Sequence, residues 1–293
     1  MVNISNMVSI KPDRPIDRLT VAVMREIDAL AHELELPYFV CGAMARDILL
    51  THVHGINTGS ETRDVDFGIA VSSWAQFENI KRRLVKTGRF KPVDKVAQCL
   101  LYTLNDNAAG YPVDIIPFRG VEQPPNTVAW PPDRGDVMNV IGYEEVLAAA
   151  LRVEVEPGLL LSVISLPGIA LLKLFAWADR GLKSSKDARD LAILFRHYTD
   201  AGNYDRVLAE MPDVLERLDY KIDLAGVRLL GRDVHNMAAA GTLDQIAQLT
   251  ADDVRMEKLV THLATQLRAY EFDDAISLAE DYLAQFKAGL SGS

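Results

Sequence analysis

Carboxylates separated by a single apolar residue are the feature of this chain most suggestive of chemistry. Asp64 and Asp66 alternate within the run 64–69, and Asp114 lies inside a second apolar run, 111–116. Alternate side chains of a β-strand leave the same face, so the first two carboxylates point the same way. Hard cations take oxygen ligands, and a two-metal site stabilises both the attacking and the leaving oxygen. The pattern predicts a site in which Asp64, Asp66 and Asp114 hold two magnesium ions that clamp a triphosphate.

A glycine turn precedes the carboxylate pair. Gly42 follows the predicted strand 38–41, and a short helical pattern containing Ala43 and Arg46 follows it. Glycine permits a tight turn and close approach of the backbone to a ligand, and the first N–H groups of a helix can receive phosphate oxygens. The alternative is a pair of solvated carboxylates at a strand edge. Asp114 argues against it, because a carboxylate in an apolar run needs a metal or other partners.

A second group of charged residues surrounds a predicted helix–turn–helix. Lys173 interrupts an apolar helix pattern and needs a partner or an anionic ligand there. Asp187 and Asp190 are three residues apart and share a helix face, whereas Lys186 and Asp190 are four apart and can pair. Together with Arg180 they form either a ligand site or a structural network of salt bridges.

Composition indicates an ordinary globular chain of 293 residues with a net charge of −10. This charge argues against a broad, non-specific surface for nucleic acids. A local basic segment exists between residues 81 and 95, and it is either an RNA-binding surface or the solvated side of a helix. Its members are Lys81, Arg82, Arg83, Lys86, Arg89, Lys91 and Lys95.

Targeting and cysteine patterns favour the cytoplasm. Residues 1–15 lack the apolar region of a signal peptide. The longest apolar stretch, 158–175, is interrupted by polar residues, proline and glycine, so we expect no membrane span. Cys41 and Cys99 have no metal-ligand spacing and read as buried small hydrophobic residues in a reducing compartment.

Hydrophobic periodicity predicts a mixed α/β region followed by helices alone. The expected strands are 38–41, 64–71, 90–96, 99–104, 111–118, 152–156 and 159–165, and the expected helices of this region are 16–34, 42–50, 74–87 and 143–150. Residues 105–110 read as a hairpin turn and 124–132 as irregular. Beyond residue 168 the helical pattern breaks near Gly181, Gly202, Pro212, Gly241 and Gly289. We expect one domain over 1–160 and a helical domain over 161–293.

The segment 40–70 resembles the signature of the nucleotidyltransferase (polymerase-β-like) superfamily, which includes the tRNA CCA-adding and poly(A) polymerases. Gly42 matches the first glycine of that signature, Asp64 and Asp66 match the metal pair, and Asp114 matches the third carboxylate. Arg46 opens a run similar to the Arg-Asp-hydrophobic run of the CCA-adding enzymes. Ala43 departs from the family pattern, which has glycine or serine there, so a hydroxyl contact to phosphate is missing.

The second charged group resembles the AbiEii-type nucleotidyltransferases, among them toxins of type IV toxin–antitoxin systems. Lys173 matches their helix lysine, and Lys186, Asp187 and Asp190 match a Lys-Asp-x-x-Asp motif. The resemblance implies that Lys173 contacts the triphosphate, that Asp187 acts in catalysis or holds the second motif, and that Asp190 supports it. The nucleotide-binding residues that it implies are Gly42, Ala43, Arg46, Lys173, Arg180, Lys186 and Asp190.

Both resemblances imply a nucleotidyltransferase core with a mixed β-sheet, and a C-terminal helical bundle that completes the active-site cleft. The implied reaction moves a nucleoside monophosphate from an NTP to an acceptor hydroxyl, with two Mg²⁺ ions. An RNA, with a tRNA 3′ end foremost, is the expected acceptor, and a cognate antitoxin is a potential partner. Three alternatives stay open: a small-molecule transferase of the antibiotic-modifying kind, a protein-modifying transferase, and a non-catalytic nucleotide-binding module.

Overall fold

A computed structural model describes residues 7–59, 62–104, 110–132, 134–181, 184–267 and 272–292. The chain divides into two compact units, Met1–Ser165 and Leu166–Ser293. A boundary after residue 160 would cut β10 (Leu159–Val163), which pairs with two other strands. The division therefore falls a few residues further along, where the first helix of the second unit begins.

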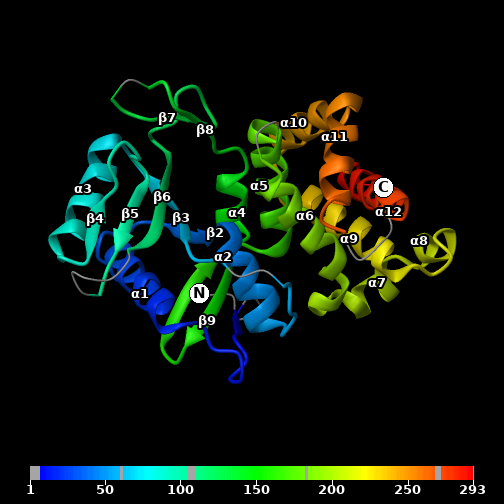
Figure 1. The fold of residues 1–293 in the computed structure, drawn as a ribbon, viewed down its shortest axis with the longest axis horizontal. Coiled ribbons are helices and arrows are strands. Elements are labelled where there is room, and N and C mark those ends of the chain that lie inside the picture. The colour runs from blue at the N-terminus through cyan, green and yellow to red at the C-terminus, as the bar shows by residue number, and fades with distance from the viewer. Residues whose placement is uncertain are drawn as a thin grey trace. The chain divides into compact units, whose positions relative to one another are not determined.

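The first unit is built on an eight-stranded mixed sheet of order β1-β9-β10-β2-β3-β6-β5-β4 (Figure 1). Its other strands are β1 (Met7–Ser9), β2 (Tyr38–Cys41), β3 (Val65–Val71), β4 (Phe90–Pro92), β5 (Cys99–Tyr102), β6 (Tyr111–Arg119) and β9 (Leu151–Glu156). The central pair β3 and β6 is parallel, whereas β2 with β3 and β5 with β6 are antiparallel. The expected α/β fold with a mixed sheet is confirmed.

Apolar runs place the central strands in the core. All four residues of β2 are buried, and Phe39, Phe67 and Ile115 of three adjacent strands have no exposed surface. Such runs are typical of strands covered on both faces. The strands that carry the candidate carboxylates are therefore rigid supports.

The helices of the first unit follow the predicted periodicity closely. They are α1 (Arg18–Glu33), α2 (Gly42–Asp47), α3 (Trp74–Lys86) and α4 (Tyr143–Ala148), and α2 continues into the π-helix η2 (Ile48–Val53). Asp17 caps α1, because its side chain accepts the backbone N–H groups of Leu19 and Thr20. The apolar stripe of α1, with Val23 and Ile27, is buried.

Three details of the first unit differ from the prediction. β4 ends at Pro92 instead of residue 96, because its pairing with β5 stops there. The proline-containing segment is not wholly irregular, since β7 (Thr127–Ala129) pairs with β8 (Val137–Asn139). The polar N-terminal segment contributes β1, which pairs with β9. Of the predicted turn 105–110, residues 105–109 lie outside the described residues.

The second unit contains only helices among its described residues. They are α5 (Leu166–Arg180), α6 (Lys186–His197), η3 (Thr199–Asn203), α7 (Tyr204–Glu210), α8 (Pro212–Arg217), α9 (Ile222–Met237), α10 (Ala240–Thr250), α11 (Asp253–Ala264) and α12 (Phe272–Leu290). Gly202, with φ +81°, and Pro212 interrupt the helices as predicted. In the described part of the chain, no helix is long and apolar enough to cross a membrane.

Gly289 does not break a helix, contrary to the prediction. It lies inside α12 and faces Gly231 of α9, and a β-carbon at position 289 would meet the Arg228 carbonyl oxygen at 2.2 Å. A β-carbon at Gly231 would meet the Phe286 carbonyl oxygen at 2.3 Å. Both glycines therefore allow α9 and α12 to pack backbone against backbone. A sequence pattern cannot distinguish such a contact from a helix break.

Candidate functional site

The candidate carboxylates meet at one register position of the sheet. Asp66 of β3 lies opposite Asp114 of the parallel strand β6, Cys41 of β2 lies opposite Asp66, and Cys99 of β5 lies opposite Asp114. Side chains at paired positions of neighbouring strands leave the same face of a sheet. The row Cys41–Asp66–Asp114–Cys99 therefore places two carboxylates side by side, with a thiol at each end.

Gly42 fits directly against Asp66. Its φ is +67°, a left-handed conformation that L side chains rarely adopt. A β-carbon at this position would lie 1.9 Å from Asp66 Oδ2, far closer than any real contact. The glycine predicted as a phosphate-binding turn thus has a demonstrable steric role, because it leaves the space that the Asp66 carboxylate occupies. Ala43, the next residue of α2, is half-buried.

Asp64 completes the group from the start of β3. It is exposed, and its Oδ1 accepts a hydrogen bond from the Thr62 hydroxyl. Burial raises the pKa of Asp114, a hydrogen bond with the Cys99 thiol partly offsets this, and the charge of Asp64 raises the pKa further. A charge that perturbs a neighbour in this way is close to it. The charge of Asp64 therefore acts on Asp114.

Two neighbours of the carboxylates, Cys99 and Tyr111, have raised pKa values. Burial, with hydrogen bonding to Asp114 and its charge, raises the pKa of the Cys99 thiol to about 12. Burial and nearby carboxylates, among them Asp64 and Asp66, raise the pKa of Tyr111 to about 12, against the effect of its hydrogen bond with Thr20. Each shift disfavours a further negative charge. Burial is the largest cause of both shifts, and the charges of the nearby carboxylates add to it.

Arg46 of α2 is buried and pairs with its neighbour Asp47. Its side chain has no exposure, and its guanidinium donates to Asp47 Oδ1 from Nε at 2.9 Å and from Nη2 at 2.6 Å. Asp47 Oδ2 in turn accepts the backbone N–H of Thr62 at 3.2 Å. This chain of contacts connects α2 to the segment that leads into Asp64. In this conformation Arg46 positions the carboxylate-bearing segment, and its nucleotide-binding role stays a prediction.

The second predicted group forms a compact ion-pair network in the helical unit. Lys173 Nζ of α5 lies 3.2 Å from Asp187 Oδ1 and 2.5 Å from Asp190 Oδ2 of α6. Arg180 donates to both Asp187 oxygens, at 2.6 and 2.7 Å. Lys186 is exposed at the start of α6. The lysine that the sequence predicts to need a partner thus has two carboxylates.

Asp187 is the centre of this network. Its side chain is fully buried, whereas that of Arg180 is 55% exposed. Burial alone would raise the pKa of Asp187, but the hydrogen bonds from Arg180 and the charges of Lys173 and Arg180 outweigh it and lower the pKa. Asp187 is therefore ionised and hydrogen-bonded on both oxygens. This geometry supports a structural role, and the predicted catalytic role of Asp187 stays a prediction.

A family model described as "Nucleotidyl transferase AbiEii toxin, Type IV TA system" matches residues 60–277, about three quarters of the chain. This chain belongs to the AbiEii nucleotidyltransferase toxin family. The assignment confirms the resemblance seen in the sequence and makes the protein a nucleotidyltransferase. The matched segment includes all three carboxylates and the whole Lys173 network, while Gly42 and Arg46 precede it.

Solved structures with distant similarity to this AbiEii-family chain are also nucleotidyltransferases or similar to them. An antigenic nucleotidyltransferase-like protein from Paracoccidioides brasiliensis is 15% identical, with 72% of this chain and 95% of that chain covered and a TM-score of 0.42. The antibiotic-resistance factor ANT(2'')-Ia is 14% identical, with 70% of this chain and 99% of that chain covered and a TM-score of 0.38. A CCA-adding enzyme with ATP is 16% identical, with 92% of this chain and 68% of that chain covered and a TM-score of 0.29. No match was found among curated proteins.

Four neighbours of the carboxylates were not predicted from sequence as parts of the site. They are Cys41, Cys99, Thr62 and Tyr111. The two cysteines were interpreted only as buried hydrophobic residues, and Cys99 is instead half-buried beside Asp114. No local signal in the sequence marks the two cysteines as neighbours of the carboxylates, because their position depends on the register between strands that are distant along the chain.

Proposed function

We propose that this protein is a magnesium-dependent nucleotidyltransferase that transfers a nucleoside monophosphate from an NTP to the terminal hydroxyl of an RNA, foremost a tRNA 3′ end. The observation that carries the proposal is the in-register pair Asp66 and Asp114, with Gly42 leaving space for the Asp66 carboxylate. In the reaction, the acceptor oxygen bonds to the α-phosphorus, the bond to the pyrophosphate oxygen breaks, and the acceptor proton is released.

The residues at this position fit a magnesium site. Asp64, Asp66 and Asp114 supply carboxylate oxygens, the ligands that Mg²⁺ prefers, and the charge of Asp64 adds to the effect of burial in raising the pKa of Asp114. Among the described residues, no group of three or more His, Cys, Asp or Glu side chains is already gathered as a metal cage.

Each carboxylate has a proposed task. Asp66 and Asp64 hold the cations that bind the triphosphate, and Asp114 shares one cation and orients the acceptor hydroxyl. Bound Mg²⁺ would neutralise the phosphate oxygens and the developing charge on the leaving pyrophosphate. Gly42 leaves space for the Asp66 carboxylate. Catalysis then consists mainly of positioning and charge stabilisation.

The basic segment supports the choice of an RNA acceptor. The basic segment 81–95 lies in the same unit as the carboxylates and can attract a polyanion. The family is that of type IV toxin–antitoxin systems, so we also propose an antitoxin partner and a site of action in the cytoplasm, where NTPs and RNA occur. The net charge of −10 favours the alternative of a cationic small-molecule acceptor, so that class belongs in any test.

The test is a transfer assay with each α-labelled NTP in turn. The protein is incubated with total RNA, with an aminoglycoside panel, or with a protein lysate freed of nucleic acid, and each mixture is run with Mg²⁺ and with EDTA. We expect Mg²⁺-dependent label in RNA of tRNA size. Label only in the small molecules or only in protein would refute the RNA acceptor, and transfer that persists in EDTA would refute the metal requirement.

A further inference from the structure

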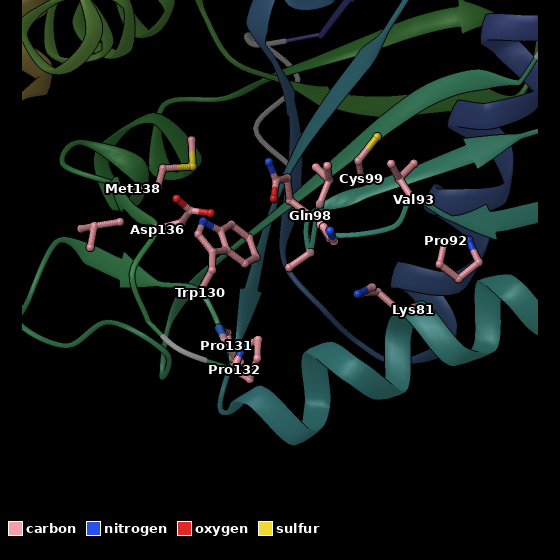
Figure 2. Close-up of a pocket in the computed structure, with 14 residues that line it drawn as sticks. Lys81, Pro92, Val93, Gln98, Cys99, Trp130, Pro131, Pro132, Asp136 and Met138 are labelled. Carbon is pink, nitrogen blue, oxygen red and sulfur yellow. The ribbon is translucent and has the colours of Figure 1, made fainter.

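A cavity of about 690 Å³ lies in the first unit, where the β4–β5 connection, α3 and the β7–β8 hairpin approach one another. Its volume is within the range of small-molecule sites. Figure 2 shows Trp130, Asp136 and Met138 on one side, Lys81, Pro92 and Val93 on the other, and Gln98 between them. The carboxylate site does not account for this cavity, because none of the three aspartates lines it.

The chemistry of the lining favours an anionic ligand with an apolar part. Lys81 and Lys95 contribute two cations against the single carboxylate of Asp136. Lys81 is only 16% exposed, and its Nζ lies 3.7 Å from Oε1 of the exposed Glu78 and 5.4 Å from the centre of the Phe77 ring, so its position is restricted. Trp130 packs against Trp74 and Phe77 and forms a rigid apolar wall. A cationic ligand would be repelled by both lysines.

The cavity adjoins the proposed catalytic carboxylates through one residue. Cys99 lines the cavity, is the register partner of Asp114, and shares a hydrogen bond with it. Cys99 is therefore shared by the lining of the cavity and by the surroundings of the carboxylate that we propose orients the acceptor hydroxyl. Cys99 lies on β5 and Asp114 on the paired strand β6, so the sheet fixes the positions of both residues.

We propose that this cavity holds the terminal nucleotide of the RNA acceptor, with the base and sugar against the apolar wall and the terminal phosphates near Lys81 and Lys95. The inference rests on the proposed function and gives the acceptor a defined place. It also divides the basic segment into two parts. Lys81 and Lys95 line the cavity, while Arg83 and Arg89 form ion pairs with Glu33 and Glu26 of α1.

The experiment compares two double variants that remove the same charge from the same segment. Lys81→Gln/Lys95→Gln changes the cavity, and Arg82→Gln/Lys86→Gln changes exposed cations that are not among the lining residues. With bulk tRNA as acceptor, we expect the first variant to raise the acceptor KM by about tenfold to a hundredfold, the loss expected for charged contacts. The slope of the logarithm of its RNA-binding constant against the logarithm of the salt concentration should become shallower by about 0.7 for each lost contact to a single-stranded phosphate. The second variant should change the KM by much less.

A second pair of variants avoids any packing change. Val137 is 63% exposed at the cavity rim and Val254 is 78% exposed in the helical unit. Val137→Glu should raise the acceptor KM by repelling phosphate, and Val254→Glu should not.

The outcomes separate the two proposals. Absence of any transfer to tRNA by the wild type overturns the proposed function and this inference with it. Normal wild-type transfer with equal effects of the two double variants overturns the cavity assignment alone. A rise in the KM for NTP rather than for tRNA would assign the cavity to the NTP and would also overturn it.

Discussion

At the scale of single residues, the Asp66 carboxylate occupies the space that a β-carbon on residue 42 would need. Gly42→Ala should therefore displace that carboxylate and lower nucleotide transfer by at least about a hundredfold, the usual cost of losing one electrostatic group of a transition state. The left-handed φ adds backbone strain of about 1 kcal/mol. Transfer is measured with labelled NTP, and folding by thermal denaturation.

Gly158→Ala is the matched control for this change. Gly158 has φ +82° in the turn between β9 and β10, and a β-carbon there would have open space around it, with nothing within 4 Å. The alanine carries the same backbone strain without a collision, so the melting temperature should fall similarly while transfer is retained. Equal loss of transfer in both variants would show that strain, rather than displacement of Asp66, disables the protein.

The Lys173 network makes a second prediction at this scale. Asp187→Ala leaves Lys173 with one carboxylate partner fewer inside the unit, and breaking a buried ion pair costs about 3–5 kcal/mol. Arg180→Ala removes a 55% exposed partner of the same aspartate and should cost much less. Denaturant unfolding of both variants measures the difference. If Asp187→Ala is as stable as the wild type but inactive, the residue serves the reaction rather than the fold.

At the scale of elements, long apolar runs were predicted well and short strands were not. The limits of β2 follow from a buried run and from Pro37, whereas α5 begins at Leu166, before the expected start beyond residue 168, with Pro167 in its first turn. β1, β7 and β8 have three residues each, too few to show a period in the sequence; β1 pairs with the distant strand β9, and β7 and β8 pair with each other. The helix contact at Gly289 was mistaken for a break because the sequence does not show that α9 faces it.

The contact between α5 and α11 predicts a pH dependence of stability. Trp177 Nε1 donates to His262 Nδ1 at 3.1 Å, so that nitrogen must be unprotonated. Burial and the charge of Lys258 lower the pKa of His262 below 6.5. The unfolded chain therefore binds more protons than the folded protein once the pH falls through 6.5. The free energy of unfolding then decreases until the pH has fallen below the lower pKa of the folded state.

The measurement is the melting temperature across about pH 7.5 to 5.5, where histidines titrate. His262→Gln keeps a hydrogen-bond acceptor without a titrating ring and should show a shallower decline than the wild type. The decline should not vanish, because burial also lowers the pKa of His54 and His197. An unchanged slope in His262→Gln would remove the Trp177 contact from the pH response.

At the scale of the whole molecule, the sequence predicted the family and the order of an α/β region followed by a helical region. The spacing of Asp64, Asp66 and Asp114 indicates the chemistry, because metal ligands follow from residue type and strand period. The surroundings of that group were not predictable. The thiol of Cys99, the fit of Gly42 and the cavity beside them arise from the pairing of strands that are far apart in the sequence.

The central claim is that Asp66 and Asp114 form the catalytic centre, and the most direct test is nucleotide transfer by Asp66→Asn and Asp114→Asn. Pyrophosphate release and label transfer are measured with Mg²⁺, beside Asp244→Asn as a control for an exposed carboxylate in the helical unit. We predict that both site variants lose at least about a hundredfold in rate while their melting temperatures hold, since a polar amide replaces one of several crowded like charges. Folded Asp66→Asn protein that transfers at the wild-type rate would contradict the account.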